Sequence, residues 1–461
     1  MRDVVPDRAA AATIGGLLRG LEYDGDTIPD LVGEEVAERE DVVVAERRLS
    51  ESPLETAIRL LYLQLTVAEK KAAEALGSGG VEALLATGLI GRSGTELVPA
   101  GRIVPVDDTL LASDGFTRDA DDPPDYVATY TPTARTCDLL TPRPRARRAL
   151  DVGTGSGIHA LLAARHAKHV VATDVNPRAL AYTALNAAMN ELDNVECRSG
   201  SFFEPAGDES FDLITCNAPF VVSPETRWAY RDSAFHGDDL TAHVVGEAAS
   251  HLADGGYATL LGSWLIVDED APEERPVQWV RRTGCDAWIL TSIESDPLEH
   301  AASWNSSFFA ETSGYAEALE RWTRYIGELG ARGVGEGAIL LHKRAGRTTV
   351  RIDEIDEDAL EDADRQIRRA FENRARLNGA DLGESRLARA MPLRLERTLG
   401  AKRADVVLEE GTGSILPTTA AAAGVVELLN GRKRLRKLGA DPRAVKLCRE
   451  LLELGALRIV D

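Results

Sequence analysis

The sequence is poor in the residue types that build cross-linked or membrane-embedded proteins. Its five cysteines are scattered, odd in number and without Cys-x-x-Cys spacing, so they indicate neither a disulfide framework nor a zinc site. No apolar run approaches the roughly 20 residues that span a bilayer, and the segment Met1–Asp7 lacks the apolar core of a secretion signal. We therefore expect a cytoplasmic protein with no membrane association and no metal centre.

Positive charge is also scarce. The formal net charge of −22 argues against binding of bare nucleic acid over a wide surface. The exception is the segment 365–449, which holds 19 basic and 9 acidic residues and contains five cations within residues 432–437. This run indicates either the solvated surface of a helix or a contact for an acidic partner, which is RNA or a ribosomal or protein surface.

A chain of 461 residues is too long for one ordinary hydrophobic core. We predict three units: a helical or winged-helix-like module over residues 1–125, a central domain over 126–345 and a helical or winged-helix-like module over 346–461. In the first unit we expect a helix over 56–65, then a hairpin from 97–98 and 102–104. The acidic segment 113–125, which contains two adjacent prolines, reads as a linker.

The central domain alternates strand and helix signals, which is typical of α/β folds with a parallel sheet. Predicted strands cover residues 148–152, 170–174, 194–198, 211–216, 256–262, 286–291 and 337–342. Predicted helices cover residues 157–166, 177–190, 238–253 and 314–330. Residues 292–312, which contain Trp304, are predicted to be irregular. They form either a lid or a segment that packs on the edge of the sheet. The expected fold class is α/β, with a seven-stranded Rossmann-like sheet.

The first strand of this sheet runs into a turn that contains Asp151, Gly153, Gly155 and Gly157. Glycine lets the backbone approach a bound nucleoside closely because it has no Cβ and tolerates unusual φ and ψ angles. The helix that follows presents unpaired N–H groups to an anionic ligand group. Asp174 ends the second strand. Without further signals, this pattern also suits a dinucleotide-binding fold.

A second motif, Asn217-Ala218-Pro219-Phe220, directly follows the predicted strand 211–216. The motif therefore lies at the carboxyl edge of the sheet, where open α/β sheets have their ligand clefts. Together the two motifs resemble the class I S-adenosylmethionine-dependent methyltransferases of the small methyltransferase domain type. That branch carries an Asn-Pro-Pro-aromatic motif and includes release-factor glutamine methyltransferases and rRNA N-methyltransferases. The resemblance covers roughly residues 126–265.

The resemblance implies S-adenosylmethionine as the cofactor. The residues that it assigns to the cofactor are Asp151, Gly153, Gly155, Gly157, Asp174, Ser201, Phe202 and Asn217. Asp151 either accepts from the ammonium group of the cofactor or only ties the loop. Asp174 accepts from the ribose hydroxyls, Phe202 packs on the adenine, and Ser201 stands where the family usually has an aspartate.

The resemblance also implies that Asn217, Ala218, Pro219 and Phe220 are the catalytic residues. A planar amide or exocyclic amine is a poor nucleophile because its lone pair is delocalised. The family accepts its N–H hydrogens on the Asn side chain and on the next backbone carbonyl, and the aromatic residue stacks on the target plane. Here the second position is Ala218 rather than proline, which loosens the loop but retains the carbonyl.

The function that follows from the resemblance is S-adenosylmethionine-dependent N-methyl transfer to a planar nitrogen of a macromolecule, with a protein glutamine favoured. The alternatives are a base of rRNA or tRNA, then a small molecule, then a non-catalytic cofactor-binding scaffold. We expect the macromolecular partner to be protein or RNA, with a ribosome-associated partner among the options. Trp228, Tyr230 and Arg231 are further candidates for substrate recognition.

Overall fold

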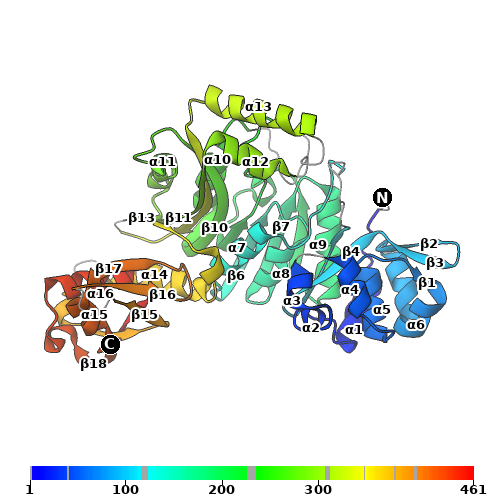
Figure 1. The fold of residues 1–461 in the computed structure, drawn as a ribbon, viewed down its shortest axis with the longest axis horizontal. Helices are drawn as coiled ribbons and strands as arrows, with labels where there is room; N and C mark the ends of the chain where they lie inside the picture. The colour runs from blue at the N-terminus through cyan, green and yellow to red at the C-terminus, as the bar shows by residue number, and fades with distance from the viewer. Residues whose placement is uncertain are drawn as a thin grey trace.

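The computed structural model describes residues 3–38, 41–115, 123–225, 235–306, 312–346, 348–377, 381–397 and 402–460. A central sheet with helices on both faces lies between a unit formed by the N-terminal residues and a unit formed by the C-terminal residues (Figure 1). None of the helices in the described ranges is long and apolar enough to cross a membrane.

The central sheet has eight strands in the order β13-β11-β12-β10-β9-β6-β7-β8. Their bounds are β6 Ala146–Val152, β7 Ala167–Asp174, β8 Val195–Ser199, β9 Phe211–Cys216, β10 Leu252–Ile266, β11 Asp286–Ser295, β12 Gly333–His342 and β13 Val350–Glu354. Strands β6 to β10 pair in parallel, and β12 is antiparallel to β10 and to β11. Buried Val171, Ile214 and Leu260 show why these strands read as continuous apolar runs.

Helices link the parallel strands and cover the faces of the sheet (Figure 1). They are α8 Ile158–Ala164, α9 Pro177–Met189, α10 Asp239–His251 and α11 Glu274–Thr283. From β6 the chain builds outward through β7 and β8, then returns to place β9 on the other side of β6. The crevice at the carboxyl ends of the strands beside such a reversal is the usual ligand site of open α/β sheets. The glycine turn and the Asn217 motif both leave the sheet there.

Two predictions for this domain were wrong. The sheet has eight strands rather than seven, because β13 pairs in parallel with β11. The segment 292–312 is not irregular as a whole, since β11 continues to Ser295 and α12 spans Pro297–Trp304. Asp296 caps α12, and Glu299 completes the capping box by accepting from the Asp296 backbone N–H. The next helix, α13 Thr312–Glu328, agrees with its prediction.

The described part of the N-terminal unit is mostly helical. Its helices are α1 Arg8–Gly20, α2 Thr27–Val32, α3 Glu34–Glu38, α4 Val42–Arg48, α5 Pro53–Ala57 with a π-helical turn to Tyr62, and α6 Glu69–Ala86. Strands β1 Val67–Ala68, β2 Ile90–Ser93 and β3 Glu96–Pro99 form a small sheet in the order β1-β3-β2. Asn186 of α9 connects this unit to the central domain: its side chain accepts from the Ala112 N–H and donates to the Ala112 carbonyl.

The predicted hairpin in this unit was wrong, because its two halves belong to different sheets. Residues 97–98 lie in β3, which pairs with β2, whereas 102–104 lie in β4 Gly101–Val106, which pairs with β5 Thr109–Asp114. The predicted linker begins inside β5, and residues 116–122 lie outside the described ranges.

Among its described residues, the C-terminal unit contains two small antiparallel sheets and three α-helices. The sheets are β18-β14-β19 and β15-β16-β17. The bounds are α14 Ala363–Leu377, β14 Arg386–Arg389, β15 Leu393–Glu396, β16 Arg403–Leu408, β17 Ile415–Thr419, α15 Ala420–Glu427, β18 Asn430–Arg434, α16 Pro442–Glu453 and β19 Leu457–Val460. The basic run is therefore not on a helix of the α type: it follows β18 into a short 3-10 turn, Leu435–Leu438. The division into three units at residues 125 and 345 stays a prediction.

Candidate functional site

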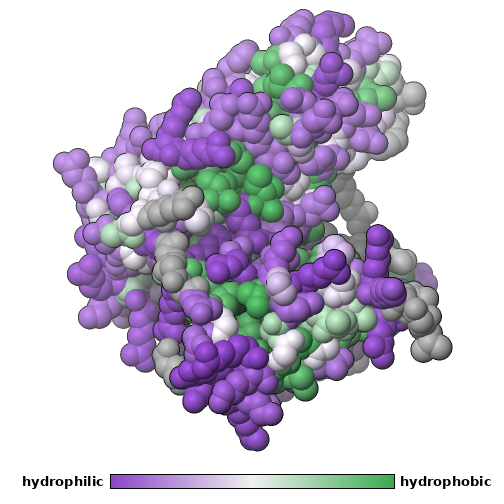
Figure 2. Space-filling view, turned by 90° about the vertical axis from the view of Figure 1, so that its left-hand side faces the viewer, coloured by the Kyte–Doolittle hydropathy of each residue, from purple (hydrophilic) through white to green (hydrophobic). Residues whose placement is uncertain are grey.

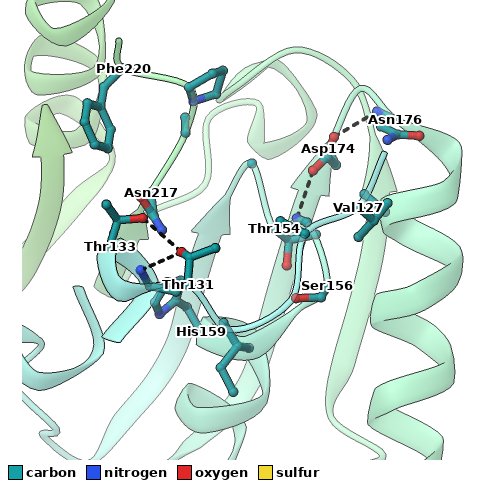
Figure 3. Close-up of a pocket in the computed structure, with 18 of the residues that line it drawn as sticks. Val127, Thr131, Thr133, Thr154, Ser156, His159, Asp174, Asn176, Asn217 and Phe220 are labelled. Atoms are coloured by element: carbon teal, nitrogen blue, oxygen red, sulfur yellow. Dashed lines mark hydrogen bonds between the residues drawn. The ribbon is translucent and has the colours of Figure 1, made fainter. Parts of the chain in front are cut away.

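A cavity of about 460 Å³ lies at the carboxyl ends of β6, β7 and β9 (Figure 3). Its lining residues are Tyr126–Thr129, Thr131–Ala134, Gly153–Ser156, Ile158, His159, Asp174–Asn176, Ala179, Phe202, Asn217–Val221 and Trp304. The cavity thus joins both sequence motifs with the segment that precedes β6. This segment begins α7 Pro132–Leu140, where Thr131 accepts from the Ala134 N–H at 3.1 Å as the N-cap.

The glycine turn leaves the cavity open on one side. Gly153 and Gly155 have φ angles of +68° and +56°, which favour glycine. A Cβ at Gly153 would lie 3.3 Å from the Ala218 Cβ, whereas a Cβ at Gly155 would meet nothing within 4 Å. Gly157 instead caps α8 at φ +91°, and a Cβ there would lie 2.8 Å from Thr183 Oγ1. It therefore permits close packing of α8 on α9 and does not line the cavity.

Asp174 holds the turn and faces the cavity. Its two carboxylate oxygens accept from the N–H of Gly155 at 3.0 Å and from the N–H of Asn176 at 2.8 Å. Burial raises the pKa of the Asp174 carboxyl above its ordinary value, and these two N–H groups oppose the rise. Each oxygen keeps a further lone pair, so the carboxylate can accept from ligand hydroxyls.

Besides Gly157, two more residues assigned to the cofactor by resemblance lie outside the lining. Asp151 is buried and accepts from Thr154 Oγ1 at 2.7 Å and from Thr215 Oγ1 at 2.8 Å, which corresponds to the alternative in which it ties the loop. The Ser201 N–H donates to Glu204 Oε2 at 3.3 Å, and Ser201 does not reach the cavity. The adjacent Phe202 does reach it.

The opposite wall is formed by the loop after β9. Figure 3 shows Asn217 beside Thr131 and Thr133, on the side of the cavity that faces Asp174. Within the described ranges the Asn217 amide has no hydrogen-bond partner, so it is available to a ligand. Cys216, which precedes it, is not a nucleophile candidate because burial raises the pKa of its thiol to about 12.

Two buried polar atoms of the lining also lack partners, and the sequence reasoning did not identify them. Thr129 Oγ1 and His159 Nε2 have no hydrogen-bond partner in the part of the chain that is described. Buried polar groups are normally satisfied, so each indicates a polar partner such as a ligand or water. His159 also lines a second, smaller pocket with Asp138 and Arg143. His159 lies in the first turn of α8, where an apolar helix pattern gives no signal for a ligand-binding histidine.

Helix α12 brings Trp304 to the same wall. The Trp304 indole N–H donates to Glu336 Oε1 at 2.9 Å, and His300 Nδ1 lies 3.2 Å from the same oxygen. His300 Nε2 lies 2.9 Å from the Val222 carbonyl and therefore carries a proton. The Trp304 ring meets the Phe220 ring edge-on, with 6.5 Å between centroids. The helix is thereby tied to the loop that carries Asn217.

The charge of the cavity favours a cationic nucleoside ligand over a dinucleotide. Within the described lining Asp174 is the sole acidic residue and neither Lys nor Arg occurs. A pyrophosphate would gain from cationic side chains, whereas a sulfonium and an ammonium group would not. The open glycine turn, the Asp174 acceptor and the unsatisfied Thr129 and His159 atoms fit S-adenosylmethionine.

Other candidate sites have less support. The described residues contain no group of three or more His, Cys, Asp or Glu side chains that could hold a metal ion. The five cysteines are all free thiols, and four of them are buried. Trp228, Tyr230 and Arg231 lie outside the described residues, so their predicted role in substrate recognition remains a prediction.

Comparisons with known proteins bear on the family of the central region. Residues 137–263 match the family model described as Methyltransferase small domain, which confirms the resemblance, and residues 20–100 match a Domain of unknown function (DUF7059). Three curated relatives are each similar to part of this chain. The ribosomal protein uL3 glutamine methyltransferase of Bradyrhizobium diazoefficiens is 34% identical over 147 residues, which cover 29% of this chain and 46% of the relative.

The other two relatives are release factor glutamine methyltransferases. That of Xylella fastidiosa is 35% identical over 130 residues, covering 26% of this chain and 47% of the relative. That of Geobacter sulfurreducens is 32% identical over 166 residues, which cover 33% of this chain and 56% of the relative. The chain thus spans about half the length of the curated relatives it matches.

Proposed function

We propose that this protein, whose residues 137–263 form a methyltransferase small domain, transfers a methyl group from S-adenosylmethionine to a planar nitrogen of a macromolecule. The favoured target is the side-chain amide of a protein glutamine. The observation that carries the proposal is the Asn217 amide: it has no partner among the described residues and faces the same cavity as Asp174.

The cofactor would be held by the opposite side of the cavity. The turn at Gly153 and Gly155 leaves room for the methionine moiety of the cofactor. Asp174 accepts from the ribose hydroxyls, and Phe202 packs on the adenine base. Thr129 and His159 offer their unsatisfied polar atoms to the same ligand. When bound, S-adenosylmethionine supplies an electrophilic methyl group.

The residues of the Asn217 loop would prepare the nitrogen. The Asn217 side-chain oxygen and the Ala218 carbonyl accept the N–H hydrogens of the target amide, which favours lone-pair density on nitrogen. Phe220 stacks on the target plane, and Trp304 holds the Phe220 ring from its edge. Alignment rather than a strong base supplies the rate enhancement, and the surplus nitrogen proton leaves to water.

The choice of glutamine rests on the relatives, two of which modify release factors and one a ribosomal protein. A base in RNA is the second candidate. The observation that favours an RNA base is the excess of basic over acidic residues in 365–449. A protein glutamine target does not account for this excess.

The test is transfer of a radiolabelled methyl group into an extract of a strain that lacks the gene. Samples are then treated with protease or with nuclease. Label that is lost from macromolecules only on protease treatment supports the amide target. Label lost only on nuclease treatment supports the RNA base, and label in the small-molecule fraction contradicts both. Asn217→Ala protein, added to the same extract, is the control for transfer that depends on this loop.

A further inference from the structure

The small sheet β18-β14-β19 takes no part in the cavity. It lies in the C-terminal unit, drawn in orange and red at the lower left of Figure 1, with β18 at the far end from the central sheet. Figure 2, which faces this side of the molecule, shows a mainly hydrophilic surface at its lower end.

The register of the sheet gathers arginines on one face. Arg386 of β14 is paired directly with Arg434 of β18, and Ala388 is paired with Arg458 of β19. Paired residues share a face, and so do residues two apart on a strand. Arg386, Arg434 and Arg458 therefore project from the same face, and all three are exposed.

Further cations adjoin these three. Arg432, Lys433 and Arg436 are also exposed, and we call the six residues the basic surface. Glu384 bonds Arg434, at 2.5 Å, and Arg436. Across the described ranges the other four have no ion-pair partner. Like charges placed directly opposite in a sheet are destabilising. Glu384 offsets the charge of Arg434 and Arg436 only, so the basic surface keeps an excess of positive charge that an anionic partner would offset.

The composition of the surface identifies the kind of anion. Five of the six residues are arginines, whose planar guanidinium binds phosphate through two parallel hydrogen bonds. Residues 381–461 contain no Phe, Tyr or Trp, so they offer no aromatic platform on which unpaired bases could stack. Phosphates of a base-paired backbone are therefore the fitting ligand. The net charge of −22 over the whole chain would repel such a polyanion elsewhere.

We propose that the basic surface binds the phosphate backbone of double-stranded RNA. The choice of RNA over DNA rests on the proposed function, because a substrate of the translation machinery lies among structured RNA. Since the basic surface is remote from the cavity, bound RNA would act as a tether that raises the local concentration of the substrate.

The test measures binding of the full-length protein to a fluorescent RNA hairpin by anisotropy, over a range of salt concentrations. We expect affinity to fall steeply with salt, and the triple variant Arg386→Gln, Arg434→Gln, Arg458→Gln to lower the slope of log K against log salt by about three. The matched control is Arg281→Gln with Arg282→Gln, two exposed arginines of α11, which should leave the slope unchanged. Glu384→Gln should tighten binding, because it removes a carboxylate from the basic surface.

Several outcomes overturn the proposal: no RNA binding at low salt, binding that the triple variant does not weaken, or tighter binding of a DNA duplex or of polyglutamate. Circular dichroism of the triple variant shows whether it is folded, and the gain expected for Glu384→Gln does not depend on a loss of fold. RNA binding is measured without cofactor or methyl transfer, so its failure is distinguishable from failure of the proposed activity.

Discussion

The two walls of the cavity differ in how their central polar side chain is held. On the cofactor wall, formed by Gly153, Gly155, Asp174 and Phe202, the carboxylate accepts from two backbone N–H groups. On the transfer wall, formed by Asn217, Ala218, Pro219, Phe220 and Trp304, the Asn217 amide has no partner among the described residues. The backbone therefore holds the Asp174 carboxylate in place, whereas no described residue holds the Asn217 amide; Thr129 and His159 also keep unsatisfied polar atoms beside the cofactor wall.

This difference predicts that the two walls can be broken separately, and the largest effect is expected at the transfer wall. Asn217→Ala should lower the rate of methyl transfer by about 100-fold or more, as loss of an aligned hydrogen-bonding group does. The dissociation constant for S-adenosylmethionine, measured by calorimetry, should change little. Asn217→Asp keeps acceptor oxygens and should retain more activity than Asn217→Ala. Equal rates for Asn217→Ala and the unmodified protein would remove Asn217 from the mechanism.

The second effect concerns the cofactor wall. Asp174→Ala should weaken cofactor binding by about 10- to 100-fold, because hydrogen bonds to a charged acceptor contribute about 1.5–3 kcal/mol. The turn should also loosen, since the Gly155 N–H loses its acceptor. Asp208→Ala is the matched control, because Asp208 is exposed on the same domain. Should Asp174→Ala bind the cofactor as tightly as Asp208→Ala, the assignment of this wall is wrong.

How well the sequence predicts a lining residue depends on the element that carries the residue. Gly153, Gly155, Asp174 and Asn217 were predictable because each stands at the end of a strand, where local sequence sets the backbone. Residues brought in from other elements were not.

Trp304 reaches the cavity only through the packing of α12, although the Asp296–Glu299 capping box was a signal for that helix. His159 and Thr129 gave no signal, since their lack of partners appears only in three dimensions. The edge strand β13 was missed because its charged, alternating residues resemble a linker.

A smaller effect tests whether Trp304 belongs to the transfer wall. Trp304→Leu removes the edge contact with Phe220, and such aromatic pairs contribute about 0.5–1.5 kcal/mol. We expect KM for the methyl acceptor to rise about 2- to 10-fold, with little change in the cofactor dissociation constant. Glu336→Gln should shift KM in the same direction but less, because the amide oxygen still accepts from the indole. Glu328→Gln, at an exposed position of α13, is the control. A change confined to cofactor binding would move Trp304 to the other wall.

The smallest effect is the pH dependence of cofactor binding. Burial holds the pKa of Asp174 above its ordinary value, so this carboxylate protonates at a less acidic pH than an exposed aspartate does. Protonation removes acceptor capacity, and affinity should therefore fall as the pH is lowered through that raised pKa. Calorimetric titrations across acidic pH should show this fall in the unmodified protein and not in Asp174→Ala. The same fall in both proteins would assign the titration to another group.

The central claim is that the transfer wall presents a planar nitrogen to the methyl donor. Its most direct test is mass spectrometry of the labelled macromolecule from the extract experiment, fragmented until the added methyl group is located on one atom. The account predicts a methylated side-chain amide nitrogen of glutamine. A methyl group on carbon, oxygen or sulfur would contradict it, because the Asn217 loop would then have no N–H hydrogens to accept.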